Sequence, residues 1–450
     1  MALDLNRIRS DFPALGESIY MNTGGTGPLS RQMVDSITGQ YRAAMEAGPD
    51  IPSVKGPINE EFERARGTVA EHFGVTPEEI ALLRSVSEGL STVAYGMDWN
   101  AGDEVIVTDE EHPTGIMVWL NLAAERGIVI RKMGLPEDRQ EMLAGLDVLI
   151  NERTKLVCIS HVTTDTGTRL PAKEICDLAH ERGVPVAMDS AQSAGQFPID
   201  LRDMDVDFYA GTGHKWLLGG WGTGYFYVKR DWVERLKVSW TGSQAGTLDR
   251  STMEELQFLD TAHRFEFGGR HTVLYGAMGK AIEYLDGVGM DSIEARSTQL
   301  ADRLKAGIAE IPGAVLRSPE SHEFSTGIVT LSVDGLDGDE VNSQMLERWK
   351  VLGRPALQQS AMRLCCAFFT EDREIDTILE AISTLANESR RAGREDCTNA
   401  IFEELVKRSE SRPLPPGGRA WTIFSGLKPM ASKLGSGRRR NDGILTRRKQ

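Results

Sequence analysis

The sequence is poor in cysteine: only five occur in 450 residues, and no two of them have Cys-x-x-Cys spacing. This count and spacing exclude a disulfide framework and a cysteine-based zinc site. No uninterrupted apolar run is long enough to cross a bilayer. Residues 1–20 also lack the apolar segment of a signal peptide. We therefore expect a cytoplasmic protein with reduced thiols, no metal and no membrane association.

Basic residues are in the minority. There are 51 Lys and Arg against 66 Asp and Glu, a formal net charge of -15. This balance excludes a general nucleic-acid binder. The exception is a basic cluster at residues 438–449. Hydrophobic residues make up 40% and charged residues 26%, which is typical of a globular protein long enough for two domains.

Apolar runs alternate with helical patterns over the first part of the chain. Helices are predicted at 31–46 and 59–73. We predict further helices at 115–126, 172–182 and 191–196. Between and around them lie predicted strands, at 104–108, 128–131, 156–160, 185–188, 207–210 and 224–228. Strands and helices at this spacing predict an α/β domain with a mainly parallel sheet that is covered on both faces.

The pattern changes at about residue 276. A helical stretch at 275–310, strands at 327–333 and 362–368, and a helix at 375–388 predict a smaller α+β domain. We expect residues 1–20 to pack with this small domain, residues 21–268 to form the large domain and residues 269–390 the small one. Residues 391–450, which contain a Pro- and Gly-rich stretch at 413–418, are expected to be a flexible basic tail.

The most specific segment is 211–216, with the sequence GTGHKW, directly after a predicted strand. Lys215 in this place can be partly desolvated, which lowers the pKa of its amine and lets it form an imine with an aldehyde cofactor. Thr212 and His214 flank it as possible phosphate donors. Taken alone, Lys215 could equally be an ordinary surface lysine.

Asp189 follows the predicted strand 185–188, at the edge where ligands bind in open parallel sheets. A carboxylate there can hold a pyridine nitrogen protonated, which makes the ring an electron sink. It could also simply cap a helix. Val86 and Ser87 lie in SVSEG, just before an apolar helical run, where free backbone N–H groups suit a phosphate.

Two further residues are candidates. His112 follows the strand 104–108, and its imidazole could stack on a flat ring, relay a proton or be merely structural. Arg363 opens an apolar strand and needs a partner there. Either a substrate carboxylate or an acidic residue of the same domain would supply that partner.

From about Tyr20 to Asn387 these segments resemble the class V aminotransferase family, in fold type I of the pyridoxal-phosphate (PLP) enzymes. The family includes cysteine desulfurases, cysteine C–S lyases and isopenicillin N epimerase-like proteins. The resemblance is carried by DSAQS at 189–193 and GHK at 213–215, with support from SHV at 160–162, FEFG at 265–268 and TED at 370–372. It implies PLP as the cofactor, a mainly parallel seven-stranded sheet in the large domain and a homodimer.

The resemblance also implies individual roles. Lys215 would hold the cofactor as a Schiff base and later move the α-proton, Asp189 would pair with the ring nitrogen, and Gln192 would donate to the ring's phenolic oxygen. His112 would stack on the ring, and the phosphate would be bound by Val86, Ser87, Thr212 and His214. Asn22 and Arg363 would bind the substrate. Gly269 and Arg270 would lie near the site of the partner subunit.

Three positions depart from the family pattern. Gly269 stands where related enzymes often have a threonine, and Thr164 stands where desulfurases carry an asparagine. The loop 351–361 contains no cysteine, although a desulfurase needs a nucleophilic thiol there. Cys365 and Cys366 follow Arg363 on a predicted strand, where burial is expected. A persulfide-forming desulfurase is therefore disfavoured.

The reaction itself stays open between three outcomes. The loop NTGGTGP at 22–28 is similar to that of cysteine lyases and favours β-elimination from a cysteine-like amino acid, that is, a C–S lyase. A class V aminotransferase or an isopenicillin N epimerase-like epimerase is the alternative. A non-catalytic PLP-binding regulator is unexpected because no helix-turn-helix segment precedes Tyr20.

Overall fold

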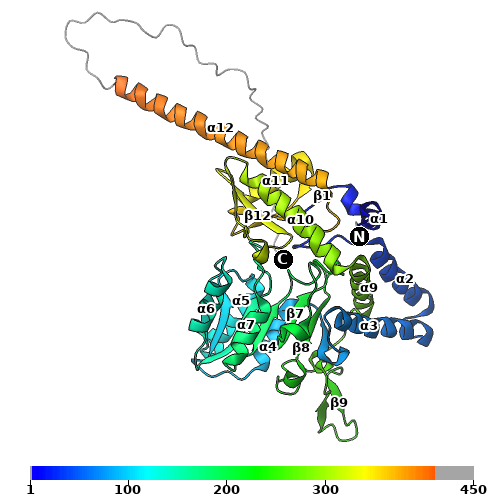
Figure 1. Ribbon diagram of the computed structural model, residues 1–450. Helices are drawn as coiled ribbons and strands as arrows, with labels where there is room; N and C mark the ends of the chain where they lie inside the picture. Colours follow the sequence, from blue (N-terminus) through cyan, green and yellow to red (C-terminus); the bar gives the residue numbers. More distant parts are fainter. Residues whose placement is uncertain (1–2, 411–450) are drawn as a thin grey trace, which may run out of the picture. The chain divides into compact units, whose positions relative to one another are not determined.

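The computed structural model describes residues 3–410, and their side chains as far as residue 392. The chain divides into two units, Met1–Arg394 and Glu395–Gln450. All of the candidate site lies in the first unit, which contains a large and a small sheet (Figure 1). No helix among the described residues is sufficiently long and apolar to cross a membrane.

The large sheet has seven strands, and six of them run in the same direction. Only β8 is antiparallel to its neighbours, which confirms the mainly parallel α/β fold. In spatial order the strands are β2 (Ile80–Leu83), β8 (Gly224–Val228), β7 (Phe208–Thr212), β6 (Val186–Asp189), β5 (Thr154–Ser160), β3 (Glu104–Thr108) and β4 (Val129–Met133).

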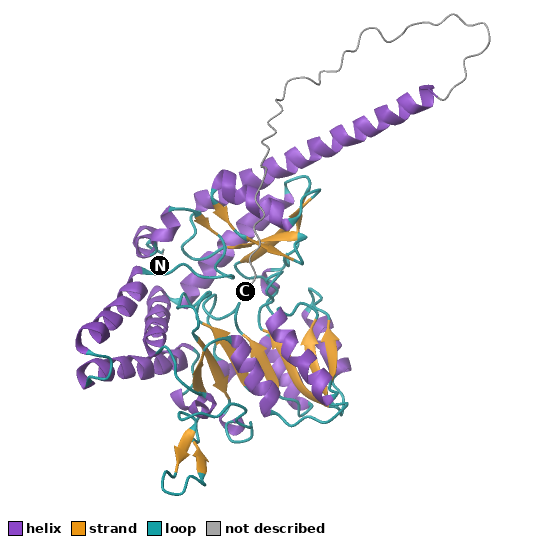
Figure 2. Ribbon diagram, turned by 180° about the vertical axis from the view of Figure 1, so that it is seen from behind, coloured by secondary structure: helices purple, strands orange, loops and turns teal. Residues whose placement is uncertain are grey.

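Each face of this sheet has its own core. Alternate residues of β3 point to opposite faces, so Ile106 packs in one cluster while Val105 and Val107 pack in the other. This arrangement explains why the interior strands are continuous apolar runs. Helices cover both faces (Figure 2). They are α3 (Pro52–His72), α4 (Val86–Gly96), α5 (Pro113–Arg126), α6 (Arg139–Leu149), α7 (Ala172–Glu181), α8 (Leu201–Met204) and α9 (Thr272–Val288).

The small sheet is antiparallel, in the order β11 (Ala314–Leu316), β12 (Ile328–Val333), β15 (Ala361–Cys365) and β14 (Arg354–Ala356). Its helices are α10 (Met290–Ala309), α11 (Gly338–Trp349) and α12 (Asp372–Glu410). The N-terminal segment lies against this part of the chain: Arg9 pairs with Glu374 at 2.9 Å, and β1 (Ile19–Tyr20) pairs with β13 (Val351–Leu352).

The remaining elements are peripheral. Helix α1 (Leu5–Asp11) lies in the N-terminal segment, and α2 (Arg31–Ala47) packs beside α9 (Figure 1). A hairpin of β9 (Gly246–Leu248) and β10 (Leu256–Phe258) projects from the body of the first unit (Figure 1). Short 3-10 helices occupy Pro13–Gly16, Pro77–Glu79, Arg230–Trp232, Ala262–Phe265 and His322–Phe324.

Two sequence-based expectations about helices are wrong. Residues 191–196 form turns rather than a helix. Gly195 has φ +95°, and a Cβ there would lie 2.5 Å from the carbonyl oxygen of Trp216. The second error concerns the tail: α12 continues to Glu410, so the chain is helical well past 391. The basic cluster at 438–449 lies outside the described residues.

Helix α9 packs mainly against α3 and α2. Its residues Tyr275, Met278 and Ile282 lie in a core cluster that contains strands of the large sheet and also Ile328 of the small sheet, so the expected boundary after residue 268 stays a prediction. Strand β2, all four residues of which are buried, was missed from sequence because IALL is too short and uniform to show a period.

Candidate active site

The candidate residues gather at the carboxyl ends of the parallel strands. Thr108, Ser160, Asp189 and Thr212 are the last residues of β3, β5, β6 and β7. After β3 the chain adds β4 on one side and β5 on the other, so the strand order reverses between β3 and β5. Ligands of open α/β sheets bind at such a reversal.

Lys215 and Asp189 face the same cavity, of about 220 Å³. Burial lowers the pKa of the Lys215 amine to about 8, although the charge of Asp189 opposes this. Burial likewise raises the pKa of Asp189, against a hydrogen bond from the Ala191 N–H to Oδ1 at 2.8 Å. An amine that is partly neutral near physiological pH therefore shares a cavity with a buried carboxylate.

One end of this cavity suits a phosphate. Val86 and Ser87 are the first residues of α4, whose N-cap Ser85 makes no side-chain hydrogen bond to the helix, so backbone N–H groups remain available there. Thr212 Oγ1 lies 2.7 Å from Nδ1 of His214, and both residues line the cavity. Burial lowers the pKa of His214, which leaves its imidazole neutral.

Glycine brings this helix close to the sheet. A Cβ at Gly89 would lie 2.6 Å from that of Ala210 on β7, so only glycine lets α4 pack so tightly. The loop 22–28 approaches Lys215 in the same way: Gly27 donates from N to the carbonyl oxygen of His214 at 2.8 Å. A Cβ at Gly27 would lie 2.3 Å from the Lys215 carbonyl oxygen.

His112 caps the N-terminus of α5, where its Nδ1 accepts the Thr114 N–H at 3.2 Å. Burial, and then the charge of Lys215, lower the pKa of His112 to about 4. The imidazole is therefore neutral at physiological pH. It lines the same cavity as Lys215, which fits a stacking role better than that of a proton donor.

Glu111 is a residue that sequence reasoning missed. Its carboxylate accepts from the Ser160 N–H at 2.9 Å, from Ser160 Oγ at 2.7 Å and from Thr108 Oγ1 at 2.7 Å. Burial raises the pKa of this carboxyl group. Glu111 thus joins the ends of β3 and β5 beside His112. Its place directly after a buried strand was the available signal.

Gln192 has both ends of its amide engaged. Its Oε1 accepts the Trp216 indole N–H at 2.9 Å, and its Nε2 donates to the Gly24 carbonyl oxygen at 3.0 Å and to Thr164 Oγ1 at 3.1 Å. Donation to a ring oxygen would require one of the last two bonds to change, so this role stays a prediction.

Arg363 is buried on β15 and is short of partners. Its Nη1 donates to the carbonyl oxygen of Thr164 at 2.7 Å and to Thr164 Oγ1 at 3.1 Å. Its Nε and Nη2 are buried, and neither has a hydrogen-bond partner among the described residues. No acidic residue within the described part of the chain pairs with it. A buried guanidinium with two free donors suits a bidentate carboxylate.

The other predicted residues lie differently. Asn22 is not among the residues that line the cavity, and its Oδ1 is buried without a partner behind Gly25. Arg270 is turned into its own chain, where it pairs with Glu266 at 2.6 Å and donates to the Leu82 carbonyl oxygen at 3.0 Å. Gly269 has open space around it. Proximity to a partner's site stays a prediction for both Gly269 and Arg270.

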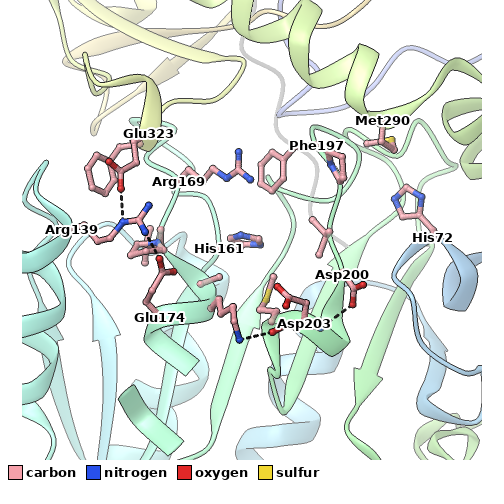
Figure 3. Close-up of a pocket in the computed structure, with 18 residues that line it drawn as sticks. His72, Arg139, His161, Arg169, Glu174, Phe197, Asp200, Asp203, Met290 and Glu323 are labelled. Carbon is pink, nitrogen blue, oxygen red and sulfur yellow. Dashed lines mark hydrogen bonds and ion pairs between the residues drawn. The ribbon is translucent and has the colours of Figure 1, made fainter. Parts of the chain in front are cut away.

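His161 lines a separate cavity of about 560 Å³. Its neighbours Ser160 and Val162 line the cavity that contains Lys215, so the His161 side chain points the other way. Figure 3 shows Arg139 between Glu174 and Glu323, with both of which it pairs. His161 hydrogen-bonds Tyr209 at 2.8 Å, and burial lowers the pKa of His161 to about 3. We assign no chemistry to this cavity.

Comparison with known proteins decides the family. The family profile described as "Aminotransferase class-V" matches residues 19–352. The chain belongs to the class V aminotransferase family. It is 30% identical to isopenicillin N epimerase of Streptomyces clavuligerus over 387 residues, 82% of this chain and 95% of that protein. It is also 30% identical to a probable cysteine desulfurase of Synechocystis over 351 residues, 74% and 82% of the two chains.

Solved structures of the cystine C–S lyase C-DES are similar as well. Its complex with the reaction product cysteine persulfide is 28% identical, with a TM-score of 0.77 over 83% of this chain and 99% of that one. A mutant of the same lyase, with glycine covalently linked to its PLP cofactor, has a TM-score of 0.78 and is also 28% identical. This match covers 83% of the present chain and 98% of the lyase chain. The predicted fold type I architecture is therefore confirmed.

PLP is the cofactor of this family member, and the residues present fit it. The cavity offers a buried lysine amine, a carboxylate beside it and an N-terminal helix end at its rim. When bound, PLP withdraws electrons from the α-carbon of an amino acid. The chain is thus a PLP-dependent enzyme of the class V aminotransferase family.

Proposed function

We propose that this enzyme is a C–S lyase that eliminates the sulfur substituent from a cysteine-like amino acid. The balanced reaction converts an S-substituted cysteine and water into a thiol, pyruvate and ammonium. The supporting observation is the partly neutral Lys215 amine, which shares its cavity with Asp189 and an adjoining cavity with the underpaired Arg363.

The roles of the residues follow from their surroundings. Arg363 binds the substrate's α-carboxylate with its free Nε and Nη2 donors, which orients the α-carbon toward Lys215. The Lys215 amine, with its pKa near 8, takes the α-proton and afterwards protonates the leaving sulfur. The Asp189 carboxylate holds the cofactor nitrogen protonated, and His112 packs against the ring.

The remaining residues bind the cofactor's phosphate and hold the ring in place. Val86 and Ser87 would donate from the start of α4, and Thr212 and His214 from the end of β7 and the residues after it, which line the same cavity. The neutral state of His214 is compatible with donation from one ring nitrogen, since its other nitrogen lies beside Thr212. Gln192 holds the 22–28 loop through its bond to the Gly24 carbonyl oxygen, and the Asn22 carbonyl oxygen accepts the Gly25 and Thr26 N–H groups within that loop.

The absence of a loop thiol favours the lyase over a desulfurase. The segment between β14 and β15 contains no cysteine, and both Cys365 and Cys366 are buried. Burial raises the pKa of the Cys365 thiol, which suppresses the thiolate needed as a sulfur acceptor. The C–S lyase C-DES is 28% identical to this chain, against 22% for two cysteine desulfurase structures of equal structural similarity, which supports the same choice.

An epimerase is the second candidate, because isopenicillin N epimerase matches over 95% of its own length. Epimerisation needs a proton donor on the face of the α-carbon opposite Lys215. His112, which lines the same cavity, is neutral because burial lowers its pKa to about 4. This makes it a poor acid, so the site supports elimination better.

The decisive experiment is a product analysis with S-substituted L-cysteines, without a keto-acid acceptor. The proposal expects pyruvate and ammonium in equal amounts from the wild type and none from Lys215→Ala. Alanine with released sulfur would indicate a desulfurase, inverted substrate an epimerase, and dependence on a keto acid an aminotransferase. Sedimentation of the wild type tests the homodimer that we also propose.

A further inference from the structure

The loop after β5 runs along the small sheet, beside the candidate site. Its residues 163–168 belong to no helix or strand, and all of them except Asp165 are buried. A buried carbonyl oxygen must find a hydrogen-bond donor. Because regular secondary structure does not supply these donors here, the partners of the loop show what holds it in place.

Four successive carbonyl oxygens of this loop, those of residues 164–167, accept hydrogen bonds from buried side chains of the small sheet and its connections. The donors, in the order of the oxygens, are Nη1 of Arg363 at 2.7 Å, Oγ1 of Thr330 at 2.5 Å, Oγ of Ser318 at 2.6 Å and Oγ1 of Thr326 at 3.1 Å. We call this row of four bonds the carbonyl ladder. It attaches the loop to the small sheet over its whole middle part.

Thr330 stands directly opposite Arg363. The two residues are Cα partners in the antiparallel pair of β12 and β15, so their side chains leave the same face of the small sheet. There they bind the carbonyl oxygens of two adjacent residues, Thr164 and Asp165. Since the peptide units that carry these oxygens meet at the Asp165 Cα, the Thr330 bond limits how far the Thr164 carbonyl group can turn.

The Thr164 carbonyl group in turn decides which donors of Arg363 stay free. Both hydrogen bonds of Arg363 leave from Nη1, to the carbonyl oxygen and to Oγ1 of Thr164. A guanidinium is planar and its N–H groups have a fixed geometry. Engaging Nη1 at Thr164 therefore sets the direction of Nε and Nη2, the two donors proposed to bind the substrate's α-carboxylate.

The other side of the loop is held by its own hydroxyl groups and by Glu110. Oγ1 of Thr166 donates to the Glu110 carboxylate and lies 2.8 Å from the hydroxyl oxygens of both Thr163 and Thr168. The loop is thus clamped between Glu110 and the small sheet. Removing one donor of the carbonyl ladder leaves a buried oxygen unpaired, and the loop must move to satisfy it.

We propose that Thr330 is a positioning residue for substrate binding. Through the carbonyl ladder it holds the Thr164 oxygen where Arg363 needs it in order to present Nε and Nη2 to the α-carboxylate. Thr330 acts only through these residues, because it lines neither the 220 Å³ cavity that contains Lys215 nor the adjoining one. This inference rests on the carboxylate-binding role of Arg363 in the proposed function.

The test compares an unreactive acid with its amide, so that carboxylate binding is measured apart from catalysis. The acid is β-methylthiopropionate, which is S-methylcysteine without its amino group, and calorimetry on the holoenzyme gives the ratio of the two dissociation constants. Thr330→Val removes the hydroxyl group at nearly constant volume and should lower the preference for the acid by about tenfold. Thr330→Ser keeps a hydroxyl group and should hold the preference within about twofold of wild type.

Ser325→Ala is the matched control. Ser325 is also buried, but its hydroxyl group donates within its own segment, to the carbonyl oxygens of Pro319 and Ser321. Its loss should lower stability and leave the preference for the acid unchanged. Should Thr330→Val not fold, Ser318→Ala tests the carbonyl ladder by a smaller truncation, with an expected loss of about threefold in the preference.

An unchanged preference in Thr330→Val would overturn the inference, as would an equal loss in Thr330→Ser or in Ser325→Ala. Equal affinity of the wild type for acid and amide would overturn it as well. Turnover separates the inference from the proposed function. Pyruvate from the wild type with an unchanged preference in Thr330→Val keeps the lyase and removes the role of Thr330. A lost preference, with no pyruvate from the wild type, removes the lyase and keeps that role.

Discussion

The indole N–H of Trp216 donates to Gln192 Oε1 at 2.9 Å, and this bond fixes which way the Gln192 amide points. With Oε1 engaged, Nε2 must face Gly24 and Thr164. The residue directly after Lys215 thus orients the side chain that is expected to donate to the phenolic oxygen of the cofactor ring. Thr164 Oγ1 also accepts a hydrogen bond from Arg363. Thr164 therefore links Gln192, which is expected beside the cofactor ring, to Arg363, which is expected to bind the substrate carboxylate.

Replacing Trp216 with phenylalanine keeps an aromatic ring but removes the donor. The buried Gln192 oxygen then loses its partner, which we expect to lower the free energy of unfolding by about 1–3 kcal/mol. Urea denaturation of the two proteins measures this difference. Trp221→Phe is the control, since Trp221 is 61% exposed and its replacement should change stability by less than about 0.5 kcal/mol. Equal effects would contradict the proposed orienting bond.

Lys215 is predicted to carry the cofactor covalently. Borohydride reduction of the holoenzyme, followed by digestion and mass spectrometry, should place the cofactor's mass on the peptide that contains Lys215. The internal comparison is Lys305, another lysine whose pKa burial lowers, but which is held by the Pro319 carbonyl oxygen and Ser325. Label on Lys305, or none on Lys215, would refute the assignment.

The rate of cofactor uptake by the apoenzyme should rise with pH, with a midpoint near 8. Only the neutral amine attacks an aldehyde, and a pKa of about 8 for Lys215 leaves about a tenth of it neutral at pH 7, against roughly one part in three thousand for an ordinary lysine. The charge of Asp189 raises this pKa, so Asp189→Asn should move the midpoint below 8. Stopped-flow absorbance measures the midpoint for the wild type and for Asp189→Asn. A wild-type midpoint near 10 would contradict the lowered pKa of the Lys215 amine.

The parts of the site that sequence alone predicts are those encoded by short local segments. Lys215 and Asp189 each follow an apolar run within a few residues, and parallel strands bring such ends together without any knowledge of the strand order. Ser87 directly precedes an apolar helical run, which is also a local signal. Since the run, the turn and the functional residue are consecutive, the local pattern is sufficient.

The parts that sequence missed depend on distant partners. Glu111 bonds Ser160, and Thr330 faces Arg363 only through the register of β12 and β15. No local period encodes either relationship. The mistaken helix at 191–196 has the same origin, because the turn there is imposed by contact of Gly195 with Trp216 rather than by the small residues themselves.

The motif FEFG has a structural role that leads to another prediction. Glu266 is buried, pairs with Arg66 and Arg270, and accepts the Leu82 N–H at 2.6 Å. Glu266→Ala leaves the buried Arg66 without this partner, which should cost about 3–5 kcal/mol in unfolding free energy. Glu63→Ala, which removes the exposed partner of Arg66, should cost under about 1 kcal/mol. Urea denaturation of both variants checks the difference, and similar losses would contradict it.

Alkylation separates the proposed lyase from a thiol-dependent enzyme. The four cysteines whose side chains the structure describes, namely Cys158, Cys176, Cys365 and Cys366, are all buried, and burial raises the pKa of each thiol. Iodoacetamide at pH 7.5 should therefore leave these four unmodified in the native protein and leave pyruvate formation unchanged. Urea-unfolded protein, in which all four become labelled, is the control.

The most informative thiol in that experiment is Cys365, because the Gly24 N–H lies 3.4 Å from its Sγ and Arg363 is two residues away. If activity fell in proportion to labelling of Cys365, the thiol would have to open to solvent and ionise during turnover, and a sulfur-accepting mechanism would replace elimination. Cys365→Ser distinguishes the two cases. A lyase retains pyruvate formation in this variant, because elimination needs the Lys215 amine and no thiol, whereas an enzyme that transfers sulfur to Cys365 loses its activity.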